Sequence, residues 1–306
     1  KDDFKNLIES KTKIDGSDLG MWLSQFFQVL NTPEEKRQKN LDEDLKVFPY
    51  VNGKLFKETL SFASFNSKMR ESLLECSALD WSNISPAIFG SMFQSVMNPE
   101  ERRNLGAHYT SEKNILKLIE PLFLTELKAE LKKIKNTPTK PKILAFHKKL
   151  SELKFLDPAC GCGNFLIITY REIRMLELEI IELVLTKVQG LRSEVAREAT
   201  INISQFAKVN VDQFYGIEYD EFPARIAEVA MWLMDHQMNL LVEKKFGNYY
   251  ARIPLTKAAK IVHANALRKN WEEVVPKTEL SYIIGNPPFV GAAMKNKEQI
   301  EDLEFV

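Results

Sequence analysis

The sequence predicts an α/β protein: a parallel β-sheet packed with helices, preceded by an all-α helical region. In the first hundred residues, apolar residues recur at helical spacing and no segment alternates as a strand would. After Leu105, helical segments alternate with short apolar runs, an order typical of strand–helix–strand units and of parallel sheets. We therefore expect a boundary near residues 98–105, between a helical region at 1–105 and an α/β domain at 106–306.

The helical region contains three predicted helices and one irregular segment. A Gly-Ser-Asp sequence ending at Asp18 is a helix start signal, and Pro33 follows the end of the apolar pattern. Pro49 and the Asn52-Gly53 pair favour a short hairpin or loop over residues 45–56. We predict helices over residues 18–30, 67–79 and 84–97.

The α/β region begins with a long predicted helix over residues 111–135, for which Ser111 is a plausible cap. Prolines within residues 136–141 break it. We predict strands over 153–157, 214–218, 260–263 and 282–285, helices over 164–189 and 222–243, and an inserted helical piece near 194–206.

Composition excludes several classes of protein. The chain has 306 residues, 44% of them hydrophobic and 27% charged, with three cysteines, which fits a globular protein of a reducing cytoplasm rather than a disulfide framework. No apolar run is long enough for a membrane span. The 42 basic residues balance the 42 acidic ones, so any nucleic-acid binding must come from a local patch or from another part of a longer polypeptide. The start at Lys1, without a methionine, suggests such a longer polypeptide.

The segment from Phe155 to Phe165 is the most informative motif. A buried strand ends at an acid, and two glycines let the backbone approach a ligand closely before a helix begins, whose N-terminus favours anions. The Gly-Lys-Ser/Thr ending of a P-loop and the third glycine of a dinucleotide site are both absent. The alternative is an ordinary strand–turn–helix junction. The candidate ligand-binding residues are Asp157, Pro158, Ala159, Cys160, Gly161, Gly163, Asn164 and Phe165.

Two further strand ends carry polar candidates. Glu218, followed by Tyr219, closes the second strand, where a carboxylate accepts hydrogen bonds from ribose hydroxyls. Asn265, followed by Ala266, ends the third strand and could hydrogen-bond an adenine edge. A solvated strand end is the alternative for Glu218, and a turn residue is the alternative for Asn265.

The fourth strand delivers Asn286, Pro287, Pro288 and Phe289 to the same edge of the sheet. The prolines stiffen the loop and lack backbone donors, so the Asn286 side-chain oxygen and the Pro287 carbonyl are acceptors for both hydrogens of an amino group. Phe289 offers a face on which a planar base can stack. The alternative is a plain Pro-Pro turn.

These motifs, in this order, resemble those of adenine-specific amino-group DNA methyltransferases. Together with residues 106–111, Gly-Ala-His-Tyr-Thr-Ser, and the Cys-Gly-Cys-Gly variant, they are most similar to type IIL bifunctional restriction–modification enzymes, the MmeI-like family. Residues 48–53 resemble part of the helical connector of that family.

The resemblance implies a class I S-adenosylmethionine-dependent (Rossmann-like) sheet of order 3-2-1-4, truncated after the fourth strand and exposed or repaired at that edge. It implies Tyr109 and Thr110 near the methionine end of the cofactor, residues 157–163 around its amino acid part, and Glu218 on the ribose. Cys162 and Asn265 depart from the commoner Thr and Asp. The implied partners are double-stranded DNA and the remaining domains of the parent chain, which in this family include a recognition domain and a nuclease.

The sequence thus leads to one hypothesis and three alternatives. The hypothesis is direct, metal-independent methyl transfer from S-adenosylmethionine to the exocyclic amino group of a flipped adenine. The alternatives are a protein glutamine methyltransferase, a nicotinamide dehydrogenase and a non-catalytic connector.

Overall fold

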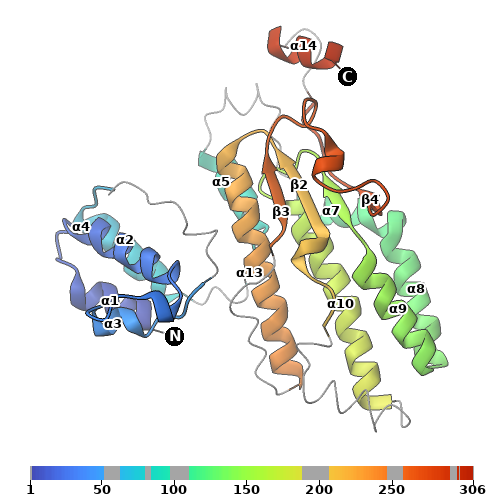
Figure 1. Cartoon of the computed structure of the whole chain (residues 1–306), viewed down its shortest axis with the longest axis horizontal. Coiled ribbons are helices and arrows are strands. Elements are labelled where there is room, and N and C mark those ends of the chain that lie inside the picture. The colour runs from blue at the N-terminus through green and yellow to red at the C-terminus, as the bar shows by residue number, and fades with distance from the viewer. Residues whose placement is uncertain are drawn as a thin grey trace. The chain divides into compact units, whose positions relative to one another are not determined.

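The chain divides into two compact units, which are described separately. The computed structural model describes residues 2–51, 63–79, 84–96, 110–187, 207–246, 258–289, 295 and 297–305 (Figure 1). The first unit holds the described residues up to Ile84, and the second holds those from Ser85 onward. None of the described helices combines the length and apolar character that a bilayer span requires.

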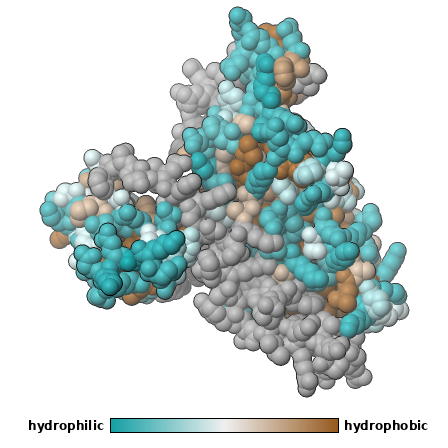
Figure 2. Space-filling model, in the orientation of Figure 1, coloured by the Kyte–Doolittle hydropathy of each residue, from teal (hydrophilic) through white to brown (hydrophobic). Residues whose placement is uncertain are grey.

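Within its described residues, every regular element of the first unit is a helix. Figure 2 shows mainly hydrophilic residues on its visible face. Its small core centres on Leu7, Val29 and Leu45. The buried Arg70 joins two helices, because its Nε donates to Thr12 Oγ1 (2.7 Å) and its Nη2 donates to the Ile8 carbonyl (3.2 Å). The elements are α1 (Asp3–Lys11), α2 (Leu19–Leu30), η1 (Glu34–Lys36), α3 (Glu43–Lys46) and α4 (Ser67–Ala78).

Two of the predicted helices are confirmed here as α2 and α4. Asp18 precedes α2, but its carboxylate accepts from the Lys13 amide (2.8 Å) rather than from the first turn of the helix. The short helix α3 enters the segment for which a hairpin or loop was predicted, and the Asn52-Gly53 turn lies outside the described residues.

The second unit contains the α/β architecture. The predicted helix over 84–97 is observed as α5, and the helices over 164–189 and 222–243 as α10 and α13; the piece near 194–206 lies outside the described residues. Its helices are α5 (Ile88–Val96), α7 (Glu112–Ile119), α8 (Thr125–Asn136), α9 (Lys140–Glu152), α10 (Asn164–Lys187), α13 (Glu221–Phe246) and α14 (Lys297–Phe305).

The predicted helix over 111–135 is present but changes its winding. A π-helical turn, η3 (Glu120–Leu124), joins α7 to α8 and contains Pro121, which has no N–H for an α-helical bond. Ser111 stands at the N-cap position of α7, although its side chain makes no capping hydrogen bond. Helix α9 was not predicted, because two nearby prolines suggested a longer break; Pro141 lies in its first turn, where a missing N–H is tolerated.

Four parallel strands form the sheet in the order β3-β2-β1-β4, as expected. Phe155 pairs with Phe214 on one side and with Tyr282 on the other. Within the described residues, β4 has only β1 as a neighbour, and its Ile283 is 53% exposed. The strands are β1 (Phe155–Asp157), β2 (Phe214–Glu218), β3 (Lys260–His263) and β4 (Tyr282–Ile283), so the fourth is shorter than predicted.

The two faces of the sheet are covered unequally. Phe155, Phe214 and Ile284 join the large core formed with the long helices, of which α10 and α13 run along the sheet in Figure 1. Leu156 and Ile217 point to the other face, where Val274 and Val275 cover them after the 3-10 helix η5 (Trp271–Glu273). Both faces are buried, as expected of a parallel sheet, but the described helices pack mainly against one of them.

A buried ionic network ties the helical layer to the strand that carries Glu218. Glu177 Oε1 contacts His147 Nε2 (2.8 Å) and accepts from the Val209 amide (2.9 Å), five residues before β2, while Oε2 accepts from Arg174. Although burial opposes ionisation, Arg174 and His147 hold the pKa of Glu177 below its usual value. The charged carboxylate therefore fixes the entry into β2.

We predict that Glu177→Gln lowers the free energy of unfolding of the intact protein by about 3 kcal/mol. An amide has one oxygen, so either the backbone donors or Arg174 would face an NH₂ group. Urea denaturation would measure the change, with Glu152→Gln as the control, because Glu152 is exposed and its contact with Lys148 (3.5 Å) contributes little. Equal midpoints for the two variants would contradict the assigned role of the network.

Candidate functional site

The carboxyl ends of three neighbouring strands meet around the side chain of Asp157. Asp157 ends β1 and is only 1% exposed, and it pairs in register with Gly216 of β2. On the other side, a Cβ added to Gly285 would lie 2.4 Å from Asp157 Oδ1, so the backbone that follows β4 passes directly against this carboxylate. The residue before Asn286 is therefore in contact with the acid of the first motif.

The glycine-rich turn after β1 is held against the end of β2. The Cys160 amide donates to the Ile217 carbonyl (3.0 Å), and the Gly161 amide donates to Glu218 Oε2 (2.7 Å). Gly161 has a φ of +54°, and a Cβ added to it would meet nothing within 4 Å, so there is open space beside the turn. Gly163, at φ +83°, lies so close to α13 that a Cβ would meet that of Ala227 at 3.0 Å.

Two buried acids give the site its electrostatic character. Burial raises the pKa of Asp157 to about 7, and the charge of Glu218 adds to the rise. Burial also raises the pKa of Glu218, although the amides of Asp220 and Gly161 act against it. A site with two carboxylates that resist ionisation favours a cationic ligand group, which would stabilise their charged forms.

The other residues of the first motif serve the turn itself. The Ala159 amide, after Pro158, donates to Asp157 Oδ1 (3.0 Å). Phe165 is buried in the main core, whereas Asn164 Oδ1 is buried and has no hydrogen-bond partner among the described residues. An unsatisfied acceptor beside a glycine turn suits a ligand that donates a hydrogen bond.

The two cysteines are structural. Cys160 and Cys162 are both 6% exposed, and burial raises the pKa of the Cys162 thiol to about 12 and that of Cys160 well above its usual value. A Cβ at Gly216 would lie 2.7 Å from Cys160 Sγ, so this glycine makes room for the thiol on the sheet. Neither thiol is a nucleophile at neutral pH.

The Asn286 segment lies at the same edge but faces outward. The Ile284 amide donates to the Leu156 carbonyl (2.9 Å), which anchors the end of β4 to β1. Asn286 Nδ2 then donates to Thr110 Oγ1 (3.2 Å). Pro287 and Pro288 are exposed, and Phe289 is 90% exposed, so its ring is available for stacking.

Thr110 therefore lies beside Asn286, a contact that the sequence did not suggest. The resemblance implied that Thr110 lies near the methionine end of a cofactor. In the structure, Thr110 contacts the side-chain amide of Asn286, which is 176 residues further along the chain. Tyr109 lies outside the described residues.

The candidate residues after β2 and β3 are in the same region. Tyr219 is 52% exposed, and the Ala264 amide donates to the Glu218 carbonyl (2.8 Å), which joins the two strand ends. Asn265 Oδ1 accepts from the Leu267 amide (3.0 Å), and the Ala266 carbonyl accepts from Trp271 Nε1 (2.8 Å).

Two residues at this edge were missed by the sequence reasoning. Gly285 was counted as the end of a strand, although a glycine immediately before Asn286 was a signal of close backbone approach. Asp302 of α14 accepts from Asn265 Nδ2 (2.6 Å), and no sequence signal linked these two residues.

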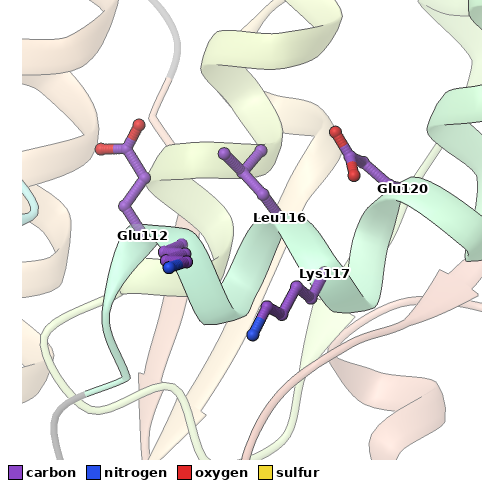
Figure 3. Close-up of a pocket in the computed structure, with 5 residues that line it drawn as sticks. Glu112, Leu116, Lys117 and Glu120 are labelled. Atoms are coloured by element: carbon purple, nitrogen blue, oxygen red, sulfur yellow. The ribbon is translucent and has the colours of Figure 1, made fainter.

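A separate shallow hollow lies along α7 and η3 (Figure 3). Its lining side chains, Glu112, Lys113, Leu116, Lys117 and Glu120, come from one continuous helical stretch and carry opposite charges. None of them is a candidate site residue. Across the described parts of the chain, no three His, Cys, Asp or Glu side chains are grouped as metal ligands would be.

Comparisons with known proteins show the family of the chain. A family model described as the MmeI DNA-methyltransferase domain matches residues 131–306, and one described as the MmeI helicase spacer domain matches residues 1–56. The chain is also similar to a solved structure of the type IIL restriction–modification enzyme MmeI in complex with DNA, with 56% identity and a TM-score of 0.90 over 99% of this chain and 39% of that one.

Two curated proteins are similar in sequence. DNA methyltransferase A of Bacillus subtilis (strain 168) is 39% identical over 307 residues, 99% of this chain and 33% of that protein. A putative type II restriction enzyme and methyltransferase of Methanocaldococcus jannaschii is 27% identical over 198 residues, 51% of this chain and 17% of that protein. The chain thus spans a third or less of each. Because the methyltransferase-domain match covers more than half of the chain, the chain belongs to the MmeI-type DNA-methyltransferase family.

Proposed function

We propose that residues 106–306 form the cofactor-binding and catalytic core of an adenine-specific DNA methyltransferase with a class I Rossmann-like sheet, and that residues 1–105 form its helical spacer. The observation that carries this proposal is the contact between Gly285 and the Asp157 carboxylate. It joins the acidic glycine-rich turn to the Asn-Pro-Pro-Phe segment, so a methyl donor held at the turn and an amino group held at Asn286 would lie next to each other.

The residues of the turn fit S-adenosylmethionine. Asp157 would accept a hydrogen bond from the ammonium group of the cofactor, and the open space beside Gly161 would admit its methionine part. Asn164 Oδ1 is a buried acceptor without a partner among the described residues. Glu218 would accept from the ribose hydroxyls. When bound, this cofactor supplies an electrophilic methyl group already activated by a sulfonium.

The Asn286 segment would hold the adenine amino group. Asn286 Oδ1 and the Pro287 carbonyl would each accept one N–H, which draws the nitrogen lone pair out of conjugation and favours the positive charge that develops on the nitrogen. Pro288 stiffens the segment, and the exposed ring of Phe289 would stack on the flipped base. The contact with Thr110 supports this assignment, because it occupies the donor end of the Asn286 amide and leaves the oxygen as the acceptor.

The alternatives have less support. A nicotinamide dehydrogenase needs a third glycine, but Leu166 occupies that position and is fully buried. A protein glutamine methyltransferase shares the Asn-Pro-Pro segment, and DNA and protein acceptors assayed side by side would separate the two. Titration with the cofactor would distinguish a catalytic domain from a non-catalytic connector.

The proposed setting is a restriction–modification protein in the cytoplasm. Double-stranded DNA and the other domains of the parent chain, including a recognition domain and a possible nuclease, would be its partners. The similarity to the solved structure of MmeI in complex with DNA, together with the match to the MmeI spacer domain, supports this assignment.

We predict that Asn286→Ala lowers methyl transfer to adenine by about 10²-fold or more, because the amino group loses an oriented acceptor. Transfer of labelled methyl groups to DNA by the intact protein would measure this, and calorimetry should give a cofactor affinity within about twofold of the wild type. Asn136→Ala, at the exposed end of α8, is the control. Wild-type turnover in Asn286→Ala would refute the catalytic assignment.

We also predict that Thr110→Val lowers kcat by about tenfold, whereas Thr110→Ser retains most of it. Valine has nearly the shape of threonine but cannot accept from Asn286 Nδ2, so the Asn286 side chain loses a contact that holds it in place. Steady-state kinetics would measure kcat and the cofactor KM. A rise in KM alone would instead assign Thr110 to the cofactor.

Finally, we predict that cofactor affinity rises between pH 6 and pH 7 and levels off above it. The raised pKa of Asp157, about 7, means that the ligand-free site holds a proton below that pH, and a cationic ligand must displace it. Between about pH 4 and pH 7, the same shift makes the ligand-free folded protein bind more protons than the unfolded chain. Its free energy of unfolding therefore falls as the pH rises through that window.

Calorimetry with S-adenosylhomocysteine in buffers of different ionisation enthalpy would measure the released proton. Asp157→Asn should bind more weakly and release no such proton, and its titration also corrects for ionisation of the ligand. Identical proton release from the two proteins would show that another group titrates.

A further inference from the structure

Both polar atoms of the Asn265 side chain are already engaged within the chain. Oδ1 accepts from the Leu267 amide (3.0 Å), and Nδ2 donates to Asp302 Oδ2 (2.6 Å). The amide oxygen has two acceptor positions, and only one of them is used by Leu267. Because the Asp302 carboxylate can only accept, it determines that Nδ2 faces Asp302 and Oδ1 faces away from it. Asn265 therefore keeps one acceptor position on Oδ1 and one N–H on Nδ2, and the contact with Asp302 fixes the side on which the acceptor lies.

Asp302 is itself held firmly on α14. The residue is 8% exposed, and its second oxygen, Oδ1, accepts from Arg268 Nε (2.6 Å). The hydrogen bonds from Arg268 and Asn265 hold the pKa of Asp302 below its usual value, so it is a carboxylate at neutral pH and can only accept. The Arg268 guanidinium in turn lies over the ring of Phe305, 4.4 Å from its centroid.

These contacts are at the cofactor edge of the sheet. Glu218, the proposed ribose residue, pairs in register with His263, two residues before Asn265. The amide of the intervening Ala264 donates to the Glu218 carbonyl (2.8 Å). An acceptor displayed by Asn265 is thus one short loop away from the ribose site.

We propose that Asp302 is a positioning residue that fixes the Asn265 amide so that its oxygen selects a 6-amino purine over a 6-oxo purine in the cofactor. The inference rests on the proposed function. An amino purine donates to an acceptor at this point, whereas a 6-oxo purine would bring an oxygen against an oxygen, an unpaired contact that binding sites reject strongly. Without Asp302, the amide can turn and offer Nδ2 instead.

The test compares S-adenosylhomocysteine with S-inosylhomocysteine as ligands of the intact protein. The wild type should prefer the adenosyl compound by at least about tenfold. Asp302→Ala should bind the adenosyl compound more weakly and narrow the preference to about twofold or threefold. In turnover, its KM for the cofactor should rise by a larger factor than its kcat falls.

Two further variants separate positioning from simple docking of α14. Phe305→Ala removes the ring under Arg268 but leaves both hydrogen bonds of Asp302, so it should keep the wild-type preference. Asn265→Ala should narrow the preference as Asp302→Ala does, and the double variant should be no worse than either single one. Thermal unfolding of each variant would verify that it is folded.

An unchanged preference in a folded Asp302→Ala protein would overturn the inference while leaving the proposed function intact. An equal loss of the preference for the adenosyl ligand in Phe305→Ala would also overturn the inference, because the packing of α14 would then explain the loss. Failure of the wild type to bind either ligand would refute the proposed function, and the inference with it.

Discussion

The contact between the Gly285 backbone and the Asp157 carboxylate is the constraint on which the site depends. A side chain at position 285 would collide with Asp157 Oδ1, so β4 can follow β1 to its end only with a glycine there. Burial raises the pKa of this carboxylate to about 7, and the charge of Glu218 adds to the rise. The glycine therefore brings Asn286, the next residue, close to a buried acid whose pKa is raised.

The same principle extends across the sheet. Gly216 leaves space for the Cys160 side chain, and Gly163 lets the start of α10 approach α13 at Ala227. The turn after β1 is thus pressed between the neighbouring strand and a helix, and the Gly161 amide reaches Glu218. The donor to Glu218 comes from a residue at φ +54°, a conformation that favours glycine, so the backbone of the turn helps to position the second acid.

The sequence predicted what local patterns determine. Buried strands were identified because an apolar run ending in a polar residue, as at Asp157 or Glu218, is a strong signal in parallel sheets. Helix α9 was missed because Pro141 reads as a breaker until its place in the first turn is known. The contacts of Thr110 with Asn286 and of Asn265 with Asp302 span 176 and 37 residues, and no periodicity encodes such distances.

The side-chain amides of Asn286 and Asn265, at the edge of the sheet, each need a neighbour that holds them in one orientation. A carboxamide presents a donor and an acceptor of nearly equal size, so its direction has to be fixed from outside. Thr110, just before α7, takes the donor end of Asn286, and Asp302 of α14 takes that of Asn265. Each amide keeps an acceptor position on its oxygen, which matches the amino groups of the two adenines that the proposed reaction brings together, one in the DNA and one in the cofactor. The carboxylate of Asp302, which can only accept, thus sets the direction of the Asn265 amide, and the hydroxyl of Thr110 holds the Asn286 amide from a segment outside the sheet.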